Sequence, residues 1–218
     1  PAATCSYDHP GGTFVNGSVI ALDAGRVWYL DRSEGSMLVF LNVAASYAAW
    51  FAVATLASHG LYLLAVLPSL AAVSLHLALT PSSGRRAELL LIAAAIALGV
   101  VVEAVHMAAG ATRYSPLATP GGLPPAFMIG LWAAFATLVN VSLAWLKGRV
   151  LLACVFGAVA SGPSYYAGSK LGALELGEPV WQSLLIIGMV WAVAFPVLLQ
   201  LALVLDRTGG HLRSWKKS

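Results

Sequence analysis

Residues 37–84 read MLVFLNVAASYAAWFAVATLASHGLYLLAVLPSLAAVSLHLALTPSSG, and these 48 residues contain no Asp, Glu, Lys or Arg. Further charge-free runs cover 114–146, 150–169 and 179–205. A charged side chain at the centre of a bilayer costs about 2.5–3.5 kcal/mol on insertion scales, so such runs are typical of segments that lie in lipid. The sequence therefore predicts an all-α, polytopic membrane protein.

Six segments are long enough to cross the hydrocarbon core of a bilayer, which takes about 20 apolar residues. These segments are about 38–57, 61–80, 88–109, 126–146, 150–173 and 181–205. Short connections that contain glycine separate them, for example 58–60 between the first two and 147–149 between the fourth and fifth,. We therefore expect six transmembrane helices in one membrane domain that covers 37–218.

Basic residues determine the expected orientation, because Lys and Arg concentrate in cytoplasmic loops. Eight of them lie in the second and fourth loops and in the C-terminal tail, namely Arg85, Arg86, Lys147, Arg149, Arg207, Arg213, Lys216 and Lys217. The opposite side holds Arg113 and Lys170 together with the acidic Glu175 and Glu178. This asymmetry predicts that both ends of the membrane domain face the cytoplasm.

Residues 1–36 do not share the pattern of the membrane domain. They carry two basic and four acidic side chains, and they contain no apolar stretch after a basic one, so they are not a signal peptide,. Turn residues at 16–17 and 23–25 flank Ser18–Leu22 and precede Arg26–Leu30, which favours a small β-hairpin,. We expect 1–36 to be a non-membrane extension outside the fold, with Met37 as the natural start. A short cytoplasmic extension is the alternative.

Ionisable side chains inside the spans form the candidate site. Glu103 and His106 lie one turn apart on one face of the third span, and the predicted orientation places them in its outer half,. Tyr165, Tyr166 and Lys170 lie in the outer half of the fifth span. Such groups face the bundle interior or a wet cavity and mark a functional site. The hypothesis is a substrate-binding cavity lined by these five residues. The alternative is that Glu103 is neutral, or paired with Lys170 or His106, and only joins helices.

The other polar features of the spans receive a structural interpretation. Gly162 and Pro163 predict a kink in the fifth helix, because proline removes a backbone donor. Four polar side chains nearer the cytoplasm are expected to be satisfied by other helices: Asn42, His76, Asn140 and Gln200,. Glu103 and His106 are not a full set of metal ligands, so no metal site is expected, and no cofactor is predicted.

Five stretches of the chain carry a family resemblance. They are Leu75-His76-Leu77, Arg85-Arg86-Ala87-Glu88-Leu89, the acidic Glu103 late in the third span, Leu131–Ala136 and Gly162–Ala173. This pattern resembles an uncharacterised family of bacterial inner-membrane proteins, the domain of unknown function numbered 2878. The resemblance covers nearly all of 37–218 and none of 1–36, and Glu103 stands where we expect the family to prefer Asp. It implies a multi-pass protein of the plasma (inner) membrane and carries over no catalytic residue.

Three classes of function remain open. The first is transport or binding of a small molecule or lipid through an outer-half polar cavity. The second is an accessory or assembly protein with no site of its own. The third is a lipid-modifying enzyme with Glu103 or His106 as acid or base, although no HExxH or GxSxG signature is present,. We expect membrane lipid and a small-molecule ligand as partners, and no nucleic acid, because the basic residues lie at helix ends. The oligomeric state is open.

Overall fold

The computed structural model describes residues 14–15, 18–23, 26–30 and 32–214, and it describes the side chains of 37–205. The chain divides into two compact units, residues 1–41 and residues 42–218. Each unit is described by itself below.

The first unit contains an antiparallel three-stranded sheet in the order β1-β2-β3, formed by β1 (Phe14–Val15), β2 (Ser18–Asp23) and β3 (Arg26–Leu30). Val19 pairs with Leu30, and Asp23 pairs with Arg26 at the turn end. The predicted hairpin is therefore confirmed for its strands. The turn residues 16–17 and 24–25 lie outside the described residues.

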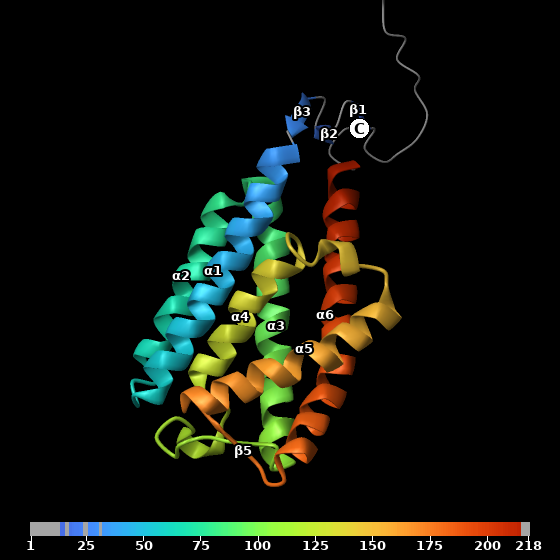
Figure 1. Ribbon diagram of the computed structural model, residues 1–218. Helices are drawn as coiled ribbons and strands as arrows, with labels where there is room; N and C mark the ends of the chain where they lie inside the picture. The colour runs from blue at the N-terminus through green and yellow to red at the C-terminus, as the bar shows by residue number, and fades with distance from the viewer. Residues whose placement is uncertain (1–13, 16–17, 24–25, 31, 215–218) are drawn as a thin grey trace, which may run out of the picture. The chain divides into compact units, whose positions relative to one another are not determined.

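Six α-helices account for most of the chain: α1 (Arg32–Ser58), α2 (Leu67–Leu79), α3 (Ser82–Ala108), α4 (Ala126–Val139), α5 (Val150–Leu171) and α6 (Val180–Ser214) (Figure 1). Short 3₁₀ turns lie between them: η1 (Leu64–Val66), η2 (Pro120–Gly122) and η3 (Ala144–Leu146). A two-stranded ribbon joins β4 (Thr112–Arg113) to β5 (Glu175–Leu176). The all-α prediction is thus confirmed for the membrane domain, with one small antiparallel ribbon added.

Four helical segments are long and apolar enough to cross a bilayer: Met37–Ser58, Ser82–Ala108, Val150–Leu171 and Val180–Leu205. The two other apolar helices, Leu64–Leu79 and Ala126–Val139, are shorter. At 1.5 Å per residue α4 is about 21 Å long, less than the roughly 30 Å of hydrocarbon. Among the residues that the structure describes, four helices are thus long and apolar enough to span a membrane, which is typical of a membrane protein.

Several helix ends differ from the bounds that the sequence predicts. The fourth segment was expected to be helical to residue 146, but α4 ends at Val139 and residues 140–149 follow as turns and η3. The Asn140 side chain bonds to a neighbouring helix there, and Gly148 has a φ of +79° that suits only glycine well,. Conversely, α3 begins six residues before the predicted residue 88, at Ser82. The Arg85 guanidinium in its first turns caps α2 by donating to the carbonyls of Leu77 and Thr80, at 3.0 and 2.9 Å,.

Helices α3, α4 and α6 pack against one another, α2 packs on α4, and α5 lies across α6 (Figure 1). One apolar core joins Leu91 of α3 to Val139 of α4 and Leu198 of α6. A second core joins Phe127 of α4 to Tyr165 of α5. Pro163 lies within the continuous helix α5, so the kink at Gly162 and Pro163 stays a prediction.

Candidate binding site around Glu103

Glu103 is a fully buried carboxylate that accepts three hydrogen bonds from three other segments. The hydroxyl of Tyr114, in the loop after α3, donates to Oε2 at 2.9 Å. The indole Nε1 of Trp132, on α4, donates to Oε1 at 3.2 Å, and the Tyr165 hydroxyl, on α5, also donates to Oε1. Three donors stabilise the charge of a carboxylate that water does not reach. We call Glu103, His106, Tyr114, Trp132 and Tyr165 the Glu103 cluster.

Trp132 reaches Glu103 because α3 has no side chain at Gly99, one turn before the carboxylate. A Cβ at Gly99 would lie 2.3 Å from Cγ of Trp132, so the indole occupies that space. The other face of the indole stacks on Trp191 of α6, with ring centroids 4.5 Å apart and planes 15° apart. The glycine therefore sets the depth at which the indole N–H meets Glu103.

His106 adds a titratable group to the cluster. Its imidazole is fully buried, Nδ1 lies 3.8 Å from Oε2 of Glu103, and the ring meets that of Tyr165 edge-on at 5.3 Å. Within the described part of the chain, neither ring nitrogen has a hydrogen-bond partner. Unpaired polar atoms in a protein interior are costly and uncommon, and they concentrate where a ligand, an ion or a proton is bound.

Tyr114 lies outside the membrane-spanning segments. Burial, followed by the charge of Glu103 and the hydrogen bond to it, raises the pKa of Tyr114 well above its usual range. The phenol therefore stays protonated, and donates to Glu103, throughout the physiological pH range. Its stabilising contribution is complete below its ordinary pKa of about 10 and is lost only as the pH rises through the raised value.

The five predicted site residues do not all come together. Glu103, His106 and Tyr165 are in contact and buried. Tyr166 and Lys170 are exposed instead, and Nζ of Lys170 lies 5.1 Å from the centroid of the Tyr166 ring. Among the described residues, neither forms a hydrogen bond or ion pair with Glu103. Tyr114 and Trp132 take part in their place, and no sequence signal distinguished these two from ordinary loop and interfacial aromatics.

The cavities near the cluster are apolar. A cavity of about 30 Å³, about the volume of one water molecule, is lined by Tyr165, Phe127, Trp50 and Leu174, among others,. A groove between α3 and α6 is lined by Val101, Val105, Met189 and Val193 and their neighbours. Neither space has Glu103 or His106 in its lining, so the carboxylate is closed off in this conformation.

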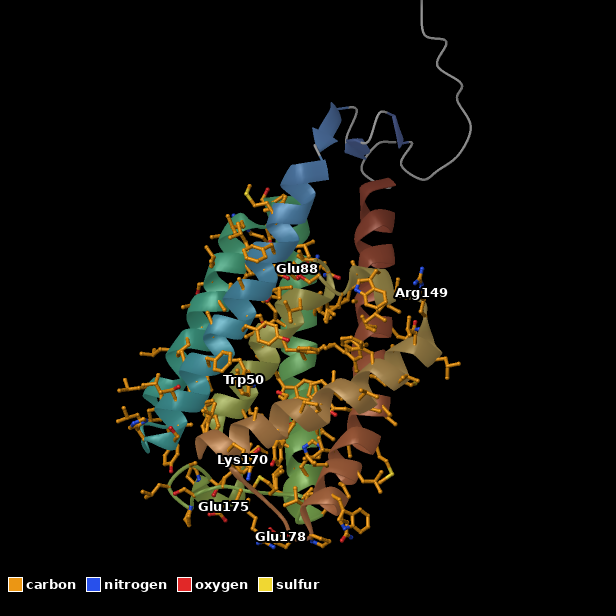
Figure 2. All side chains as sticks on the ribbon, viewed as in Figure 1. Trp50, Glu88, Arg149, Lys170, Glu175 and Glu178 are labelled. Atoms are coloured by element: carbon orange, nitrogen blue, oxygen red, sulfur yellow. The ribbon has the colours of Figure 1, made fainter. Side chains whose placement is uncertain are left out.

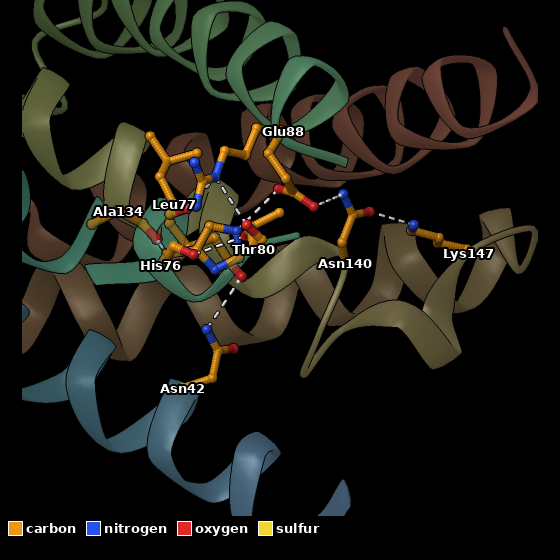
Figure 3. Close-up of polar contacts among 10 residues, drawn as sticks. Asn42, His76, Leu77, Thr80, Glu88, Ala134, Asn140 and Lys147 are labelled. Atoms are coloured by element: carbon orange, nitrogen blue, oxygen red, sulfur yellow. Dashed lines mark hydrogen bonds and ion pairs between the residues drawn. The ribbon is translucent and has the colours of Figure 1, made fainter. Parts of the chain in front are cut away.

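A second polar cluster lies at the other end of α3 (Figure 3). Nε2 of His76 lies 3.1 Å from Oε2 of Glu88, and Nδ2 of Asn140 donates to Oε1 of Glu88 at 2.7 Å. Nζ of Lys147 donates to Oδ1 of Asn140. We call His76, Glu88, Asn140 and Lys147 the Glu88 cluster.

The expectation that other helices satisfy the polar side chains of this end holds for three of the four. Besides His76 and Asn140, Asn42 donates to the carbonyl of Thr137 at 3.3 Å and accepts from Ser142 at 2.6 Å. Gln200 differs, since its side chain is exposed. Glu88 is the member that the sequence did not single out, because it follows two arginines in what reads as a polar helix end.

The described residues contain no group of three or more His, Cys, Asp or Glu placed to hold a metal ion. A family model described as a protein of unknown function (DUF2878) matches residues 39–197. No curated protein and no solved structure matches the chain.

Proposed function

Because the chain belongs to the DUF2878 family of proteins of unknown function, we propose its function from its own site. We propose that it is a membrane protein that transports or binds a small molecule or lipid, and that Glu103 and His106 form the centre of the binding site. The observation that carries this proposal is a fully buried carboxylate beside a buried imidazole whose two nitrogens have no partner among the described residues.

The first support is energetic. A carboxylate inside a membrane-spanning helix is expensive, and it persists where function requires it. A protein that needed only helix contacts could place apolar side chains here at lower cost, since a buried charge rarely adds net stability over well-packed apolar groups. His106 adds to that cost, because its ring nitrogens forgo the hydrogen bonds that water would supply in the unfolded chain,.

The second support is the convergence of separate segments. Helices α3, α4 and α5 and the loop after α3 each supply one or more members of the cluster. A relative movement of any of these segments changes the number of donors on Glu103. A site of this kind can therefore couple ligand binding to helix movement, which a transporter requires.

We further propose the six-crossing topology with both ends of the membrane domain in the cytoplasm, in the plasma (inner) membrane. Figure 2 supports this proposal, because charged side chains lie toward both ends of the helical bundle. Glu88 and Arg149 lie toward one end, and Lys170, Glu175 and Glu178 lie toward the other. The short α4 fits a crossing because the non-helical residues after it are packed among other helices, as at the fully buried Leu146,.

The second candidate is an accessory or assembly protein without a ligand. The closed state of the cluster favours it, because three donors already satisfy the Glu103 carboxylate. In that case the cluster only fixes α4 and α5 against α3.

An accessibility experiment separates the two candidates. Thr112→Cys, in a chain whose native cysteines are replaced by alanine, places a thiol at a buried position next to the cluster. In lipid nanodiscs, we expect its labelling rate to change with pH, because the cluster contains a buried carboxyl group beside a buried imidazole. Glu103→Gln should abolish that change, whereas Glu88→Gln, at the carboxylate of the Glu88 cluster on the other end of α3, should preserve it. Labelling that is independent of both pH and Glu103 would leave the accessory candidate ahead.

A further inference from the structure

The charge balance of the Glu103 cluster indicates what kind of ligand it takes. Its three donors, two phenols and one indole, are neutral, so they supply no countercharge to the carboxylate. The nearby cations are directed elsewhere: Arg113 is exposed, and Lys170 lies over the ring of Tyr166. His106 is the only titratable base in contact with Glu103 among the described residues. A single added positive charge would therefore neutralise the cluster.

The two carboxyl oxygens of Glu103 accept different numbers of hydrogen bonds. Oε1 accepts from Trp132 and Tyr165, which both stand on helices packed in the bundle. Among the described residues, Oε2 accepts a hydrogen bond only from Tyr114, and the same oxygen faces Nδ1 of His106 at 3.8 Å. A ligand that replaces the Tyr114 hydroxyl would thus lie between Oε2 and the unpartnered imidazole.

Tyr114 is also the donor that can leave most easily. It follows β4 directly, and β4 is held by only two residue pairs, Thr112 with Leu176 and Arg113 with Glu175. Two-stranded ribbons are marginally stable on their own. The ribbon is extended by one hydrogen bond, from the amide of Gly177 to the carbonyl of Ala111 at 3.1 Å.

The closed ribbon depends on a glycine. A Cβ at residue 177 would lie 2.1 Å from the carbonyl oxygen of Gly110, and this atom belongs to backbone that cannot rotate away. The hydroxyl of Ser183, at the start of α6, donates to the carbonyl of Gly177 at 3.0 Å and holds the strand down. The backbones of Gly177 and Gly110 are therefore in direct contact beside the closed ribbon.

Resting on the proposed function, we infer that the Glu103 cluster binds a singly charged cation, which enters at the β4–β5 end by displacing the Tyr114 hydroxyl from Glu103. The cation is a small organic ammonium ion, whose N–H groups would donate to Oε2 of Glu103 and to the unpartnered imidazole of His106. The titratable groups facing this position are Glu103 and His106 of α3, Tyr114 of the loop and Tyr165 of α5. We call the β4–β5 ribbon the gate, because its opening would admit the cation. We call the hydrogen bond from Tyr114 to Glu103 the latch, because it holds the gate closed.

The test uses the full chain in nanodiscs, with the fluorescence of its tryptophans as the signal, because Trp132 contacts Glu103 directly. One series varies the pH in sodium chloride, and the other adds methylammonium chloride against sodium chloride at constant ionic strength. We expect saturable binding in the methylammonium series at fixed pH, and a signal in the pH series alone would overturn the ammonium ligand. Glu103→Gln should abolish it, and Trp132→Phe should remove most of the signal.

The latch is tested with a matched pair of tyrosines. Tyr114→Phe releases the hydrogen bond that competes with the cation, so the apparent affinity should rise by about tenfold. Tyr166→Phe, at an exposed tyrosine with no bond to Glu103, should leave the affinity unchanged. Gly177→Ala should act in the same direction as Tyr114→Phe by preventing closure. If Gly177→Ala does not fold, the comparison of the two tyrosine variants still decides.

Three results would overturn the inference. Equal affinities for Tyr114→Phe and wild type would remove the latch, and binding retained in Glu103→Gln would remove the site. If neither series shows binding while labelling at Thr112→Cys still depends on Glu103, then the ligand is not a cation and the proposed function survives. If labelling is also independent of Glu103, the proposed function fails as well.

Discussion

The indole of Trp132 fills the space next to Gly99, so that a Cβ at residue 99 would lie 2.3, 2.6 and 2.8 Å from three of its carbon atoms. The glycine on α3 and the tryptophan on α4 therefore act as one unit. The contact lets the two helices approach closely and brings the indole N–H to Glu103 at 3.2 Å. A change at either residue should alter both the packing of the bundle and the hydrogen bonding of the cluster.

Gly99→Ala is expected to destabilise the protein by about 1–3 kcal/mol, because the added methyl group forces the Trp132 ring out of a well-packed position. Gly162→Ala is the matched control, since a Cβ at Gly162 meets no atom within 4 Å in the same kind of helix. Thermal unfolding in detergent, followed by circular dichroism, measures the difference. A similar midpoint for both variants would contradict the packing of Trp132 on α3.

Replacing Glu103 tests how much the protein is destabilised when the three donors to its carboxyl group lose their acceptor. Glu103→Leu leaves Tyr114, Trp132 and Tyr165 without an acceptor, at a cost of about 1–3 kcal/mol for each buried group that stays unpaired. Glu103→Gln should cost much less, since its amide oxygen still accepts and the Tyr114 hydroxyl can rotate to accept from the new NH₂ group. Tyr165→Phe should partly rescue Glu103→Leu, because a donor and its acceptor are then removed together. Additive losses in the double variant would show that the two residues are not coupled.

Cysteine labelling in intact cells tests the proposed orientation. Leu117→Cys and Arg149→Cys place thiols at exposed positions in loops on opposite sides of the proposed topology. An impermeant maleimide added outside should label residue 117 and spare residue 149 until the membrane is opened. The opposite result would invert the orientation, and labelling of both residues would contradict six crossings.

The Glu88 cluster should hold the end of α4 in place. In Glu88→Leu, Asn140 and His76 lose their carboxylate partner, and we expect a loss of about 1–3 kcal/mol. Hydrogen exchange should increase at residues 140–149, whose backbone lacks the regular bonds of a helix, and much less at the Glu103 cluster. An increase that is uniform over the whole chain would mean that Glu88 supports the entire bundle rather than this end.

Among the residues that the structure describes, the first span-length apolar segment begins at Met37. We propose that residues 1–36 are not needed for the membrane domain, so a chain that starts at Met37 should insert with the same helix content. Membrane fractionation and circular dichroism of both chains provide the measurement. Failure of the shorter chain to insert would make the extension part of the domain.

The long helices were predictable because charged side chains are costly in lipid, so a long charge-free run indicates a segment that lies in the membrane. The short elements were not. Residues 126–146 form one charge-free stretch, yet α4 ends at Val139, because the Asn140 amide finds its acceptor in Glu88, 52 residues away. A contact between residues so distant in sequence has no local signal.

The candidate site was likewise predictable from the sequence only in part. Glu103 and His106 stood out as ionisable groups in apolar surroundings, and their shared helical face was evident from the spacing of three. Tyr114 and Trp132 did not stand out, because their role depends on the return of a loop and on the absence of a side chain at Gly99. Lys170 was grouped with Glu103 only because both were predicted at the same depth in the membrane. Its exposed side chain instead lies over the ring of Tyr166.

The shortness of α4 has a consequence for how the protein is made. The insertion machinery meets residues 126–146 as a segment of ordinary span length, before α5 and α6 have been synthesised. The finished α4 is helical over only 14 residues, and the polypeptide after it winds around the Glu88 cluster. Glu88 lies N-terminal to α4, so the acceptor for the Asn140 amide is already present in the nascent chain when residue 140 is made. The hydrogen bond that ends α4 therefore needs no helix made later, and a nascent chain released before residue 150 should already carry a fourth helix that ends near Val139.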